Sequence, residues 1–74
     1  MVVNLSELEK TLREKGISYA FDYKEDGTLE LWTLTSIKHI LINILKACGV
    51  IFKEKEGKHG LYQLELTNVN VDTW

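Results

Sequence analysis

The side chains that most often carry catalytic or metal chemistry are few in this sequence and lie far apart. His39, His59 and Cys48 are the only soft metal ligands, and no two of them have a spacing that chelates an ion. Cys48 falls on the apolar side of a predicted helix, where a buried structural thiol is expected. His39 falls on the polar side of that helix, and His59 lies in a glycine-flanked loop. We therefore expect no metal site and no cofactor.

Acidic residues gather around one predicted turn, as Asp22, Glu25 and Asp26. A catalytic carboxyl group needs a perturbed pKa, usually in an apolar cleft, and hairpin tips ordinarily carry charge for solubility. The segment Gly57-Lys58-His59-Gly60 precedes a predicted strand and not a helix N-terminus, so it lacks the context of a phosphate-binding loop. The sequence thus predicts that the protein is not an enzyme.

The one local basic group consists of Lys53, Lys55, Lys58 and His59. On a hairpin, these residues could form a finger that enters a nucleic-acid groove, with Trp32 stacking on a base. Glutamates alternate with the lysines, and the whole chain has nine Lys and Arg against eleven Asp and Glu, a net charge of −2. Because overall charge opposes phosphate binding, nucleic-acid binding is the alternative hypothesis and not the first one.

The composition predicts a folded protein with a small core. Of the 74 residues, 45% are hydrophobic and 27% are charged, as in ordinary globular domains. We expect one domain, 1–74, whose marginal size favours self-association as a homodimer. One cysteine excludes an internal disulfide. Neither a secretion signal nor a membrane span is recognisable, so we expect a cytoplasmic protein that does not enter membranes.

The first half of the chain predicts a helix followed by a hairpin. Asn4 and Glu7 have the spacing of a capping box, and Gly16 is suited to end the helix. From Ile17 the apolar period changes to two, which indicates a strand. Asp26 and Gly27 predict the turn, and the chain returns as a second strand over 28–32.

The second half predicts the same order. A helix is expected from about Ser36 to Cys48, ended by Gly49, with strands over 50–55 and 61–66. After Leu66 the alternation slips, which predicts a bulge near 67–68 and then an edge strand or a tail ending in Trp74.

The two halves are alike in spacing, since 33 residues separate Gly16 from Gly49 and also Gly27 from Gly60. We therefore predict an α+β fold with an αββαββ pseudo-repeat, in half-repeats of about 4–33 and 34–67 and a tail over 68–74. Both helices should pack on one face of a four-stranded antiparallel sheet, with a possible extra C-terminal edge strand.

The other sheet face is predicted to carry surplus apolar side chains. If the alternate residues Tyr19, Phe21, Leu29, Leu31, Phe52, Tyr62 and Leu64 face the helices, Trp32, Ile51 and Leu61 lie opposite, with Ser18 and Ala20. Ile42 is expected on the outer side of the second helix. Such surfaces usually bind proteins, unless the tail with Trp74 folds back over them. We expect a small interaction module, an adaptor, regulator or inhibitor of the kind that mobile elements encode, with Trp32, Ile51, Leu61 and Ile42 contacting a protein partner.

Overall fold

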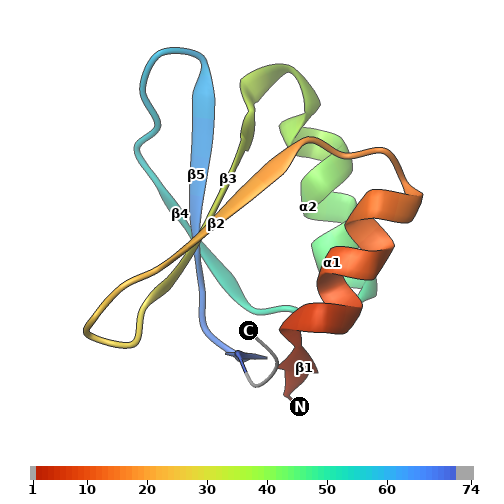
Figure 1. Cartoon of the computed structure of the whole chain (residues 1–74). Helices are drawn as coiled ribbons and strands as arrows, with labels where there is room; N and C mark the ends of the chain where they lie inside the picture. Colours follow the sequence, from red (N-terminus) through yellow and green to blue (C-terminus); the bar gives the residue numbers. More distant parts are fainter. Residues whose placement is uncertain (1, 72–74) are drawn as a thin grey trace.

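The computed structural model describes residues 2–71, which form two helices on one side of an antiparallel sheet (Figure 1). The elements in order are β1 (Val3–Asn4), α1 (Leu5–Glu14), β2 (Tyr19–Tyr23), β3 (Leu29–Leu34), the 3₁₀ helix η1 (Thr35–Ile37), α2 (Lys38–Ala47), β4 (Phe52–Lys55), β5 (Leu61–Leu66) and β6 (Val69–Asn70). The main sheet has the order β2-β3-β5-β4, and all its neighbours are antiparallel. The predicted α+β fold is confirmed.

Both helices end as the glycine pattern predicts. Gly16 and Gly49 have φ values of 70° and 79°, the left-handed conformation that an L side chain rarely adopts. The amide of Ile17 donates to the carbonyl of Leu12 at 3.0 Å, and the amide of Val50 donates to that of Leu45 at 2.9 Å. These bonds across the last turn are those of a Schellman motif, and they direct the chain from each helix into the sheet.

The N-terminal capping box is not formed. Asn4 is the N-cap of α1 in an extended conformation, but its side chain makes no capping hydrogen bond. Its segment is used for strand pairing, because β1 pairs in parallel with β6 and the Val3 amide donates to the Asn68 carbonyl. A C-terminal edge strand does form, as β6, and it joins β1 in a separate two-stranded sheet. Trp74 lies outside the described residues.

The sheet register shows that the two halves are built alike. Tyr19 is opposite Thr33, and 33 residues further on Phe52 is opposite Leu66; the same shift relates all four pairs of β4 with β5 to pairs of β2 with β3. Leu31 and Leu64 are opposite each other between the two central strands. A pseudo-twofold axis thus passes between these two leucines, normal to the sheet, and relates the two αββ halves. The predicted αββαββ pseudo-repeat is confirmed.

The core lies between the helices and one sheet face. Its fully buried side chains are Leu5, Leu8, Leu12, Leu31, Leu41, Leu45 and Leu64. In α2 the fully buried side chains are Leu41 and Leu45, whereas Ile40 is turned outward and is 52% exposed. The second helix is also shorter than predicted, since residues 35–37 form a 3₁₀ turn. No helix among residues 2–71 is long and apolar enough to cross a membrane.

Candidate functional site

The sheet face that the helices leave open has two chemically different ends. Strand alternation places residues of all four main strands on this face. One end is apolar, and its side chains are those of Ala20, Trp32, Leu34 and Leu61. The other end is charged, with Asp22, Lys24, Glu30, Lys53, Lys55 and Glu65. The two ends meet in the middle of the sheet, where Trp32 is opposite Gln63.

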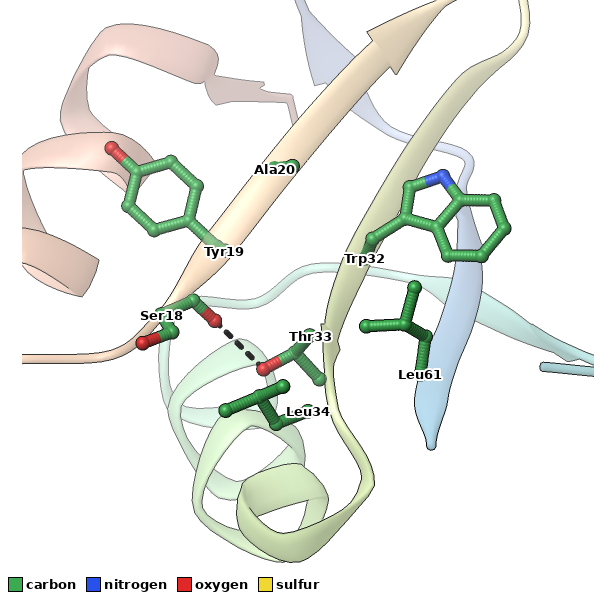
Figure 2. A pocket seen from close by; sticks show the side chains of 7 residues that line it. All are labelled: Ser18, Tyr19, Ala20, Trp32, Thr33, Leu34 and Leu61. Atoms are coloured by element: carbon green, nitrogen blue, oxygen red, sulfur yellow. Dashed lines mark hydrogen bonds between the residues drawn. The ribbon is translucent and has the colours of Figure 1, made fainter. Parts of the chain in front are cut away.

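The apolar end forms a shallow pocket of about 290 Å³ (Figure 2). Its lining residues come from three strands or their ends: Ser18, Tyr19, Ala20, Trp32, Thr33, Leu34 and Leu61. In Figure 2 the Trp32 indole and the Leu61 side chain lie next to each other, whereas the Tyr19 ring points away toward α1. Leu34 is 46% exposed and Leu61 is 38% exposed. This is where large apolar side chains adjoin each other on the open face.

Hydrogen bonds on the helix side of the sheet fix the backbone that lines the pocket. The Thr33 hydroxyl, on the helix side, donates to the Ser18 carbonyl at 2.8 Å and ties β3 to the start of β2. The Tyr19 hydroxyl donates to the Glu9 carboxylate of α1 and accepts from the Arg13 guanidinium. Because Tyr19 is fixed to α1, its backbone supports one wall of the pocket while its ring belongs to the helix side.

The structure separates the four residues predicted to contact a protein partner. Trp32 and Leu61 line the pocket together. Ile51 is 60% exposed but precedes β4, beside Asn68, at the opposite end of the sheet from the pocket. Ile42 is half-buried and packs against the core. The pocket also contains Leu34, which was not predicted because the expected strand ended at Trp32. Extending the alternation by two residues would have placed Leu34 on the same face as Trp32.

The charged end is organised around one buried carboxylate. Glu30 lies on central strand β3 with only 4% of its side chain exposed, and it accepts a hydrogen bond from Lys55. The Lys24 ammonium is 3.5 Å from the other Glu30 oxygen and 2.8 Å from Asp22. The hydrogen bond from Lys55 lowers the pKa of Glu30 against the opposing effect of burial, and the pKa of Lys55 is raised in return. A carboxylate held in this way stays ionised at neutral pH and is a poor general acid.

The predicted basic group is only partly available to phosphate. Lys55 is engaged by Glu30 and also lies 3.9 Å from Glu65, and Glu65 is directly opposite Lys53 across the β4–β5 pair. Lys58 and His59 are exposed in the loop before β5, with His59 in a left-handed conformation at φ 54°. Two carboxylates therefore sit among these lysines, and the local field is weaker than the lysine count implies.

The remaining candidates for chemistry do not converge. His39 is exposed, and Cys48 is half-buried against the core near the N-terminal residues Val2 and Val3. Among residues 2–71, no group of three His, Cys, Asp or Glu side chains could hold a metal ion. Burial raises the pKa of Tyr62, and the Glu54 carboxylate raises it further, so this phenol remains protonated. The ring of Tyr62 contacts Lys38, whose ammonium is 5.3 Å from the ring centroid, on the helix side of the sheet and away from the pocket.

Comparison with known proteins adds no further assignment: no protein-family model, no curated protein and no solved structure matches this chain. The function must therefore be argued from the open face itself.

Proposed function

We propose that the protein is a small interaction module that binds a protein partner through the apolar end of its open sheet face. The observation that carries this proposal is the grouping of Trp32, Leu34 and Leu61 around one recess on the sheet face that α1 and α2 do not cover (Figure 1). Apolar side chains that adjoin each other on a small protein surface usually mark an interface, and a tryptophan is a frequent energetic centre of one.

The chemistry of the face limits how a partner can sit on it. Burying the charged end would remove the exposed side chains of Asp22, Lys24 and Lys55 from water, at a cost that their attraction for each other and for Glu30 does not always offset. A partner should therefore cover the apolar end and leave the charged end at the rim, which is the usual arrangement of interface core and periphery.

The size of the recess favours a protein side chain over a free small molecule. Its volume of about 290 Å³ lies at or below the lower limit, roughly 300 Å³, of typical small-molecule sites. One or two apolar side chains of a partner would fill it against Trp32. A module acting in this way is an adaptor, regulator or inhibitor, and we place it in the cytoplasm because its single cysteine needs no oxidising compartment.

The proposal is tested by quantitative capture from the source cell with matched baits. Leu61→Lys places a charge in the recess, and Ile51→Lys places the same charge on a more exposed aliphatic residue outside it. At least one protein captured by the parent chain should be retained by Ile51→Lys and reduced about tenfold or more by Leu61→Lys, as expected for a central apolar contact. Equal capture by all three baits, with both variants folded, would contradict the proposal.

A further inference from the structure

The two edge strands of the main sheet are related by the pseudo-twofold axis, but only one of them carries the charges that usually prevent pairing with a further strand. β2 and β4 occupy the outer positions of the order β2-β3-β5-β4. The 33-residue shift relates Ala20 to Lys53, Phe21 to Glu54 and Asp22 to Lys55. Strand β4 thus carries a charge at three successive positions, whereas β2 has the sequence Tyr-Ala-Phe-Asp-Tyr with a single charge. Charged residues, especially lysines, are a common means of preventing an edge strand from pairing.

The backbone of β2 has groups directed away from the sheet. The Lys24 amide donates to the Thr28 carbonyl at 2.8 Å, so residues of even number in β2 direct their amides and carbonyls toward β3. Tyr19 and Phe21 must then direct theirs outward. In β4, the Thr67 amide donates to the Ile51 carbonyl, so residues of odd number direct their backbone groups toward β5. By the same alternation, the amides and carbonyls of Phe52 and Glu54 are directed outward. Among residues 2–71, no strand pairs with the outer edge of β2.

We propose that this edge of β2 pairs with β2 of a second copy of the chain, antiparallel, so that two four-stranded sheets become one continuous sheet. This inference does not depend on the proposed function, because it concerns backbone groups at the edge and not the recess on the face.

A second copy is the favoured occupant because β2 is complementary to itself. In an antiparallel pair of identical strands, one residue lies opposite its own copy, and the pairing is centred on that residue. Centres at Ala20, Phe21 or Asp22 all bring the outward amides and carbonyls of the two strands opposite each other. Centring on Asp22 would place like charges opposite each other and is disfavoured. Centring on Ala20 or Phe21 avoids that contact, and it brings Phe21 opposite Tyr19 or opposite a second Phe21. Aromatic pairs across neighbouring strands are among the favourable ones.

The small chain has reason to associate in this way. A domain of 74 residues buries a modest share of its surface, and pairing the two β2 strands removes the less charged edge of the main sheet from solvent in each copy. The charged β4 edges would then be the outer edges of the eight-stranded assembly. The first half of the pseudo-repeat, through β2, would then form the dimer contact, and the second half, through β4, would form the outer edge of the sheet.

The test compares the oligomeric state of matched variants. Ala20→Lys gives β2 the residue that β4 has at the equivalent position, and Ala47→Lys makes the same change at an exposed residue of α2. Sedimentation equilibrium over a concentration series should show a dimer for the parent chain and for Ala47→Lys. For Ala20→Lys the dimer dissociation constant should rise at least tenfold, with an unchanged far-UV circular dichroism spectrum.

Two further measurements separate the edge from the face. Leu61→Lys changes the recess from the β5 side, and β5 is two strands away from the β2 edge, so this variant should leave the dimer intact. Hydrogen exchange should show the outward amide of Phe21 protected in the dimer and that of Glu54 exchanging fast. A parent chain that remains monomeric at millimolar concentration, a Phe21 amide as fast as that of Glu54, or a dimer dissociated by Leu61→Lys and not by Ala20→Lys would each overturn the inference. A monomer that instead orders an added extended peptide along β2 would assign the edge to a different partner.

Discussion

Truncating two leucines of the same strand tests which face of the sheet is buried. Leu31 is 0% exposed at the pseudo-twofold axis, and Leu34, three residues later, is 46% exposed in the recess. Leu31→Ala loses the transfer free energy of a fully buried side chain and leaves a cavity that its close-packed neighbours cannot fill, which costs about 3 kcal/mol. Leu34→Ala loses roughly half of the transfer contribution and leaves no cavity, so we expect about 0.5 to 1 kcal/mol.

Urea unfolding followed by circular dichroism measures both changes as differences in the free energy of unfolding. A domain of this length has a stability of the order of 4 to 11 kcal/mol, so Leu31→Ala should remove a large fraction of it. Leu64→Ala, at the position related by the pseudo-repeat, should cost about as much as Leu31→Ala because Leu64 is also fully buried. If Leu34→Ala were as costly as Leu31→Ala, Leu34 would be as buried as Leu31. The assignment of one buried and one open sheet face would then be refuted.

Further predictions concern the charged end, the second hairpin loop and the alternative function. Lys55→Met should lower the urea midpoint more than Lys53→Met on the same strand, because it removes the hydrogen bond to buried Glu30, and the difference should disappear in a Glu30→Gln background. Since the folded-state pKa of Glu30 is lowered, its contribution is present at neutral pH and is lost as the pH falls through that pKa, so the cost of Lys55→Met should shrink on acidification. Gly57→Ala should destabilise the fold more than Gly60→Ala, because an added Cβ at Gly57 would overlap the carbonyl oxygen of Leu61. At Gly60 the added Cβ meets open space, and only the left-handed φ of this residue costs about 1 kcal/mol; thermal unfolding would rank the two variants. Single-stranded DNA should bind with no measurable affinity at low salt; a log–log salt slope of roughly −2 to −3 would instead assign phosphate contacts to the basic loop.

The elements of this fold could be predicted from local patterns, because each one is encoded within a few residues. The glycines after each helix predicted where the helices end, and the alternating segments on either side of Gly27 and of residues 56–60 predicted the two hairpins; the structure confirms both. The parallel pairing of Val3 with Val69 could not be predicted in this way, since it joins segments that are distant in sequence and only two residues long. The same pairing explains why the Asn4 capping pattern, which is favourable locally, was overridden.

The candidate site was predicted in part, and the missing part depended on strand order. Trp32 and Leu61 could be placed on one face by alternation alone. Whether they adjoin each other depends on β3 lying next to β5, which the sequence left open. The same order brings Lys55 to Glu30 from two strands away and removes Ile51 from the recess, so both the salt bridge and the separation of Ile51 are consequences of tertiary structure.

The recess beside Trp32 is the surface that we propose a partner covers. Oxidative footprinting of the chain with and without the captured partner measures directly whether a partner covers this recess, because the partly exposed Trp32 indole should react less once it is covered. We predict that the oxidation of Trp32 and Leu34 falls on binding while that of Ile40 and Ile51 is unchanged. Unchanged oxidation of Trp32 in a saturated complex would contradict the account, and protection of Ile51 alone would place the interface at the opposite end of the sheet.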